Sequence, residues 1–171
     1  MGRMWDDSLG ELTPAELWGR LDGSTRRDAA EAMFDERSSR READGAIADA
    51  LRFRIVSVRK LPIERRVDYL LKAVRPDDNF ASSLLMALHV QRRQPLLVTF
   101  LDALGIEHDG GVIDADDEFG PTDPDRIGSA VELLYAEHPD EQVEVYLATL
   151  IALDPDNWSG LADVLRARAD G

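Results

Sequence analysis

Apolar residues recur at helical spacing along most of the chain. After Pro62 the apolar positions follow i, i+4, i+7, i+8 and i+11, which is one face of an amphipathic helix: Ile63, Val67, Leu70, Leu71 and Val74. Comparable patterns begin near Pro14, Ser24, Glu42, Asp77, Pro95, Pro124, Pro139 and Pro155. They predict an all-α fold of roughly nine helices.

The segment from Pro95 to Gly105 is the predicted central helix. Proline suits a first helical turn because its missing N–H has no partner there, and glycine suits the position after the last turn because it accepts φ > 0. Between them only Thr99 and Asp102 are polar. A helix that is apolar on nearly all sides is buried on several of them.

Two arrangements of these helices fit the sequence. The prolines at 62, 95, 124 and 155 are 33, 29 and 31 residues apart, a spacing typical of stacked αα-hairpins in a helical-repeat-like array. Over ten residues, ATLIALDPDN at 148–157 resembles the helix-end junction of tetratricopeptide repeats, although Val131 and Leu134 stand where that repeat has Gly and Tyr. An irregular helical bundle is equally compatible.

Residues 52–59 break the helical pattern, because apolar and basic residues alternate there as in a strand. No second strand is predicted nearby. We therefore interpret the segment as the frayed end of a helix followed by an extended linker.

The length of 171 residues suits one domain, 1–171. There is no cysteine, and the N-terminus has no apolar segment of the kind found in signal peptides. No stretch is long and apolar enough for a membrane span. We expect a cytoplasmic protein that does not bind membranes.

The net charge of −14 is unevenly distributed. Residues 1–51 carry 7 basic and 12 acidic side chains, residues 52–93 carry 10 and 4, and residues 94–171 carry 3 and 18. The basic segment either faces the acidic half or is solvated, or it docks a charged partner. Its candidate interaction residues are Arg52, Arg54, Arg59, Lys60, Arg65 and Arg66.

An acidic loop of about 19 residues separates the central helix from the next one. A loop of that length in a compact domain is usually functional or disordered. We expect a flexible acidic loop at about 107–123, and it is the second candidate docking site.

Few residues indicate chemistry. No histidine has a second histidine or a cysteine at i+3 or i+4, so no pair of metal ligands is formed on one helix face. We also find no phosphate loop, nucleophile elbow or zinc motif. Neither a metal nor a cofactor is therefore expected. Asp102 is the notable carboxylate, because a buried one must be paired or shift its pKa. His89 or Arg92 could reach it from the preceding helix, and His89, Asp102 and His108 could line an inter-helix pocket.

The sequence therefore favours a non-catalytic helical adaptor that binds another protein. The alternative is a small-molecule-binding protein or an enzyme with the pocket just described. Nucleic-acid binding is disfavoured by the net charge, although the basic segment includes Phe53 and Tyr69. The oligomeric state is left open.

Overall fold

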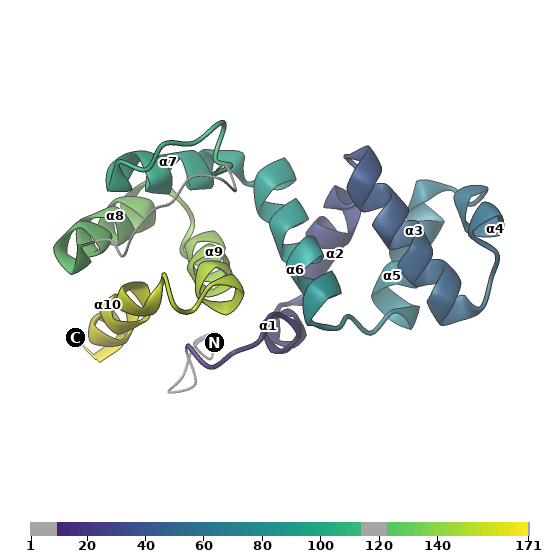
Figure 1. Ribbon diagram of the computed structural model, residues 1–171, viewed down its shortest axis with the longest axis horizontal. Helices are drawn as coiled ribbons and strands as arrows, with labels where there is room; N and C mark the ends of the chain where they lie inside the picture. Colours follow the sequence, from purple (N-terminus) through teal and green to yellow (C-terminus); the bar gives the residue numbers. More distant parts are fainter. Residues whose placement is uncertain (1–9, 114–122, 171) are drawn as a thin grey trace.

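The computed structural model describes residues 10–113 and 123–170, and the described chain is all-α, as predicted. Its elements, in order, are α1 (Pro14–Arg20), α2 (Gly23–Ala32), α3 (Arg37–Leu51), α4 (Ile55–Arg59), α5 (Ile63–Ala73), α6 (Asp78–Ala87), the π-helical turn η1 (Leu88–Arg92), α7 (Gln94–Leu104), α8 (Pro124–Glu137), α9 (Asp140–Leu153) and α10 (Ser159–Asp170). The molecule is elongated, with α4 at one end and α8 and α10 at the other (Figure 1).

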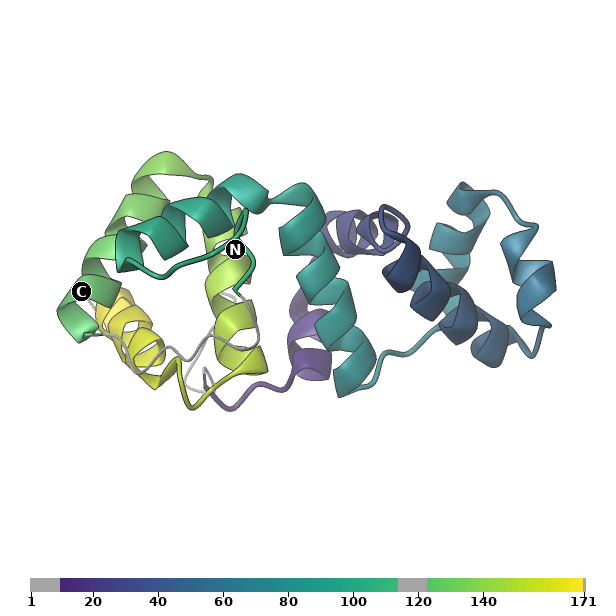
Figure 2. The same ribbon diagram turned by 45° about the horizontal axis from the view of Figure 1, so that its top comes forward.

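Two groups of helices lie side by side along the long axis (Figure 2), and each group encloses its own hydrophobic core. Helices α2 to α5 surround one core, and α1 with α7 to α10 surround the other. Helix α6 divides them, since Phe80 and Leu84 belong to the first core whereas Leu85 and its neighbour Leu88 in η1 belong to the second. Trp18 packs against both cores. The chain is thus built as two lobes that share α6.

The predicted central helix is confirmed as α7. Pro95 lies in its first turn, and Gly105 ends it in the left-handed conformation at φ 68°. Five of its side chains are buried: Leu96, Leu97, Phe100, Leu101 and Leu104. This helix organises the second lobe, where Phe100 meets Tyr146 and Trp158 at ring distances of 5.6 and 5.8 Å.

Side-chain caps begin three of the first six helices. Thr13 caps α1 by accepting from Glu16 N at 3.2 Å. Helix α2, whose pattern begins near Ser24, is capped by Asp22, which accepts from Thr25 N at 2.7 Å. These hydrogen bonds lower the pKa of Asp22. Asp77 caps α6 in the same way.

We expect Asp22→Ala to destabilise the protein by about 1 kcal/mol, because an N–H of the first turn of α2 loses its acceptor. Asp22→Asn keeps a side-chain oxygen at the cap and should remain close to the parent. Urea unfolding of both variants near neutral pH measures the difference. Equal losses would show that the charge of Asp22, rather than its capping geometry, stabilises the helix.

The extended linker expected at 52–59 is a short helix instead. Arg52 ends α3 in the left-handed conformation at φ 55°, and α4 follows after two further residues. Helix α4 has five residues and buries only Val58. The alternation of apolar and basic residues therefore does not mark the buried and exposed faces of a strand.

Proline does not mark equivalent helix starts. Pro62 is the N-cap of α5, Pro95 and Pro124 lie in the first turns of α7 and α8, and Pro155 lies in a turn four residues before α10. The final helix therefore begins at Ser159, later than the sequence suggested. Of the predicted acidic loop, residues 107–113 hold a turn closed by the bridge between Asp109 and Val112, and residues 114–122 lie outside the described part.

Candidate functional site

The end of the first lobe carries an exposed surface that is both apolar and basic. It is formed by α4 and the residues on either side of it. We call it the tip, and it consists of Arg52, Phe53, Arg54, Val56, Arg59, Lys60 and Ile63. In Figure 1 this end lies opposite α8 and α10.

The apolar part of the tip is unusually accessible. Phe53 is 48% exposed, Val56 is 56% exposed and Ile63 is 47% exposed. They are three of the six large apolar side chains that are exposed among the described residues. Burying a side chain of this size against a partner contributes roughly 1.5–3 kcal/mol. These residues are not among the predicted interaction residues, because the sequence pattern assigns Phe53 and Val56 to a helix end and extended linker and Ile63 to the apolar face of a helix.

The basic side chains of the tip are not paired with acidic side chains of the described chain. Arg52, Arg54, Arg59 and Lys60 are exposed, and none of them forms an ion pair within residues 10–113 and 123–170. Other cations in the same half are neutralised: Arg27 pairs with Asp68 at 2.7 Å and Arg92 with Asp35 at 2.7 Å. The tip cations are therefore available to an anionic group of a partner.

Arg65 and Arg66, the last two predicted interaction residues, have different surroundings. Arg65 is exposed on α5, where it donates to the hydroxyl of Tyr69 at 3.2 Å and lies 5.8 Å from the centre of that ring. The side chain of Arg66 is only 12% exposed. Arg66 is therefore part of the interior of the first lobe and not of its surface.

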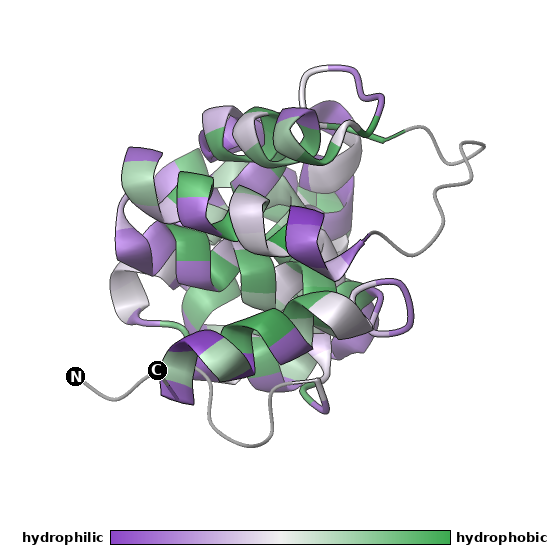
Figure 3. Ribbon diagram, turned by 90° about the vertical axis from the view of Figure 1, so that its left-hand side faces the viewer, coloured by the Kyte–Doolittle hydropathy of each residue, from purple (hydrophilic) through white to green (hydrophobic). Residues whose placement is uncertain are grey.

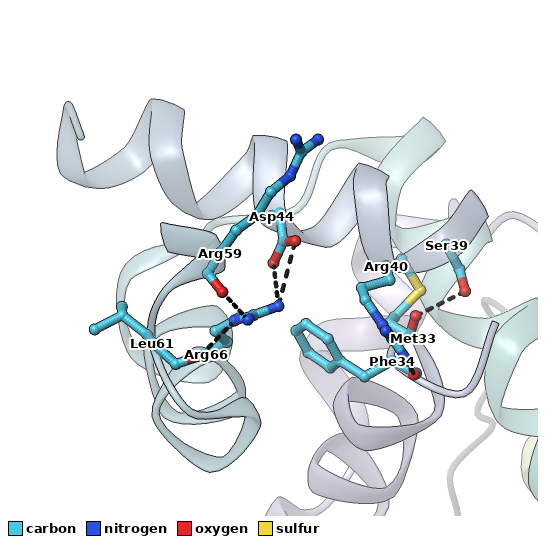
Figure 4. A network of polar contacts seen from close by, with 8 residues as sticks. All are labelled: Met33, Phe34, Ser39, Arg40, Asp44, Arg59, Leu61 and Arg66. Atoms are coloured by element: carbon cyan, nitrogen blue, oxygen red, sulfur yellow. Dashed lines mark hydrogen bonds and ion pairs between the residues drawn. The ribbon is translucent and has the colours of Figure 1, made fainter. Parts of the chain in front are cut away.

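Figure 4 shows how Arg66 joins three helices. Its guanidinium lies 3.4 Å from both carboxylate oxygens of Asp44 on α3, and the side chain of Asp44 is 3% exposed. The same guanidinium donates to the carbonyl of Leu61 at 2.9 Å and to the carbonyl of Arg59. It thus holds the end of α4 and the start of α5 against α3.

A second arginine in Figure 4 closes the turn between α2 and α3. Arg40 donates twice to the carbonyl of Phe34, at 2.6 and 3.2 Å, and Ser39 donates to the carbonyl of Met33 at 2.7 Å. These side chains satisfy carbonyls that follow the last turn of α2. Arg40 therefore stabilises the fold as Arg66 does.

His89 lies in η1 and is fully enclosed by the second lobe. Its Nε2 is 3.0 Å from the hydroxyl of Thr149, which itself donates to the carbonyl of Val145 at 2.7 Å. The hydroxyl must therefore accept from Nε2–H, and this fixes the neutral tautomer. The Tyr146 ring stands edge-on at 5.2 Å. Burial, with the nearby charge of Arg93, lowers the pKa of His89 from 6.5 to about 3.

Two buried side-chain nitrogen atoms in this region have no hydrogen-bond partner in the described chain. They are Nδ1 of His89 itself and Nη1 of Arg93. Burial lowers the pKa of Arg93. The π-helical turn places both residues at the junction of α6 and α7, and π-helical turns recur at functional sites. The arrangement keeps His89 neutral, so it supplies no charged acid at physiological pH.

Asp102 and His108 come together, as the predicted pocket required. His108 Nε2 is 2.7 Å from the Asp102 carboxylate, and Gly111 N–H donates to His108 Nδ1 at 3.0 Å. His108 therefore donates to Asp102 through Nε2–H. However, the Asp102 side chain is 67% exposed. Its two other expected neighbours bind elsewhere, since His89 forms a hydrogen bond with Thr149 and Arg92 an ion pair with Asp35. The three predicted pocket residues do not share one site.

The described chain has a surface groove of about 270 Å³ at another place, between the start of α3 and α6 with η1. Its lining includes Glu36, Glu42, Ser83, Met86 and Val90. Ser83 donates to Glu42 at 2.8 Å and Ser38 donates to Glu36, so both carboxylates already have partners within the groove. Neither Asp102 nor either predicted pocket histidine lines it.

Within the described ranges, no three His, Asp or Glu side chains are grouped so that they could hold a metal ion. None of the helices described has the length and apolar character that crossing a membrane requires. Comparisons of the chain with protein-family models, with curated proteins and with solved structures find no match. Any functional assignment therefore depends on the residues themselves.

Proposed function

We propose that this protein is a non-catalytic interaction module whose tip binds an acidic segment of a partner protein. The observation that carries the proposal is the combination at one end of the molecule of four cations without ion pairs and three exposed apolar side chains. Apolar groups give the partner a surface to cover, and the cations select a partner of negative charge.

We expect both the cations and the apolar side chains of the tip to contribute to the binding free energy. Exposed charge pairs contribute up to about 1 kcal/mol each and are screened by salt, whereas apolar burial persists at high salt. Binding should therefore weaken at high ionic strength without being abolished. The proposal replaces the six interaction residues predicted from the sequence by the tip, since Arg66 is engaged inside the fold.

The alternative function, a small-molecule site at His89, Asp102 and His108, has less support. His89 is enclosed in the core, and Asp102 with His108 lies beside the turn at 107–113. In the described part of the acidic loop, residues 107–113, Val112 is the one large apolar side chain that is exposed, so this segment offers less apolar surface than the tip.

We expect Arg59→Glu with Lys60→Glu to reduce capture of the partner at least tenfold, because two attractions become repulsions. Val56→Asp should reduce it by a similar factor, because it places a carboxylate in the apolar part of the tip. Quantitative affinity capture from the native cell lysate, at about 50 mM and about 500 mM salt, measures both effects.

The matched control is Lys72→Glu with Arg75→Glu. Both cations are exposed and belong to the same basic segment, but they lie at the other end of α5. This control changes the net charge by the same amount and should leave capture within about twofold of the parent. If the control and the tip variants lose capture equally, general charge rather than the tip determines binding.

A further inference from the structure

The two ends of the molecule belong to sequence segments of opposite net charge. The tip belongs to the segment 52–93, which has 10 basic and 4 acidic side chains, and the far end belongs to residues 94–171, with 3 and 18. Figures 1 and 2 agree that α4 and α8 lie at opposite ends of the long axis. The tip therefore cannot contact the acidic end within one chain.

The outward side of α8 is complementary to the tip, because it combines an exposed apolar side chain with carboxylates. Leu133 is 39% exposed, and exposed residues on the same side of the helix are Asp125, Ser129, Glu132, Ala136 and Glu137. Arg126 also lies on this side, with its guanidinium against Gly105 at the end of α7. We call this surface the α8 face. Figure 3 looks onto that end and shows hydrophobic positions among hydrophilic ones along its helices.

We propose that the protein assembles head to tail, with the tip of one copy docked on the α8 face of the next. The inference rests on the proposed function, because it names a second copy as the partner of the tip. Apolar residues of the tip meet Leu133, and the tip cations meet Asp125 and Glu137 on the same face, since Glu132 already pairs with Arg168. Such a contact uses two different surfaces, so repetition yields an open chain or a ring and not a closed pair.

Charge also selects this arrangement over a symmetric one. Tip-to-tip pairing would bring four cations against four others, and pairing of two α8 faces would bring carboxylates together. The net charge of −14 opposes any self-association. At physiological salt, however, the screening length is about 8 Å, so contact pairs persist while repulsion between distant acidic ends is largely screened.

Sedimentation velocity of the full chain over a concentration series tests the inference. At about 50 mM salt the average mass should rise above that of the monomer with concentration, and about 500 mM salt should reduce the association. Two variants should each weaken self-association at least tenfold: Arg59→Glu with Lys60→Glu at the tip, and Leu133→Lys with Glu137→Lys on the α8 face. An equimolar mixture of the two should form a heterodimer, because it restores one native contact.

The outcomes separate the inference from the proposed function. If the parent stays monomeric throughout, or if the α8-face variant associates as the parent does, head-to-tail assembly is wrong. If the tip variant then still loses capture of another protein, the proposed function stands with a different partner. Capture that is insensitive to the tip, together with a monomeric parent, would contradict both. Far-ultraviolet circular dichroism of each variant checks that the helices are intact.

Discussion

Replacing Arg66 by Met should destabilise the protein by roughly 3–5 kcal/mol, the loss typical of a buried ion pair from which one partner is removed. The Asp44 carboxylate is left without its cation where its side chain is only 3% exposed. The carbonyls of Leu61 and Arg59 lose a donor at the same time. Because whole domains are stable by only about 5–15 kcal/mol, this single change would remove a large fraction of the stability.

Urea unfolding at neutral pH measures the effect, with two controls. Arg65→Met, on the exposed neighbour, should cost less than about 1 kcal/mol. The double variant Asp44→Asn with Arg66→Met should be more stable than Arg66→Met alone, since it no longer buries an unpaired charge. A loss below about 1 kcal/mol for Arg66→Met would show that water solvates Asp44 well enough without the arginine.

Acidification to about pH 5 should cost the protein about 2 kcal/mol through His89 alone. The pKa of His89 is lowered in the fold from 6.5 to about 3, so between these values the unfolded chain binds the proton and the folded chain does not. Stability is therefore complete above pH 6.5, falls as the pH decreases through this window, and reaches its full loss near pH 3. Burial is the main cause, and the charge of Arg93 adds to it.

His89→Gln isolates this contribution. Glutamine can still donate an N–H to Thr149, but it does not titrate. Carboxylates titrate equally in both proteins, so the difference between their unfolding free energies at about pH 7 and pH 5 reports His89. We expect the parent to lose about 2 kcal/mol more than the variant. Equal losses would mean that His89 accepts a proton in the folded state.

The sequence predicts the helices well because their signals are local. Helices begin close to Pro14 and Asp77, where the sequence places them, and Pro95 and Gly105 bound the central helix. The errors occur where tertiary contacts decide. Residues 52–59 lack the features of a long helix, yet α4 forms because Val58 is buried and Arg66 holds the carbonyl of Arg59. Spacing along one chain does not reveal such partners.

The candidate site was predicted in part. Segregation of charge along the chain identifies the cations of the tip, since charge is read directly from composition. It cannot separate Arg66 from Arg65, although one lies in the interior and the other at the surface. It also does not identify Phe53, Val56 and Ile63 as accessible, because an apolar residue is assigned to a core unless the fold leaves it exposed. Asp102 is the opposite case, a polar residue on an apolar helix that is exposed.

Photo-crosslinking inside the native cell shows whether the tip is the docking surface. A photoreactive amino acid replaces Val56 in one protein and the exposed Glu16 of α1 in a control. We expect an adduct from position 56 that is absent from position 16 and is lost when Arg59→Glu and Lys60→Glu are added. An adduct of twice the monomer mass would identify a second copy, and any other mass a different protein. No adduct at position 56, or one that persists unchanged with the two cations reversed, would contradict the account.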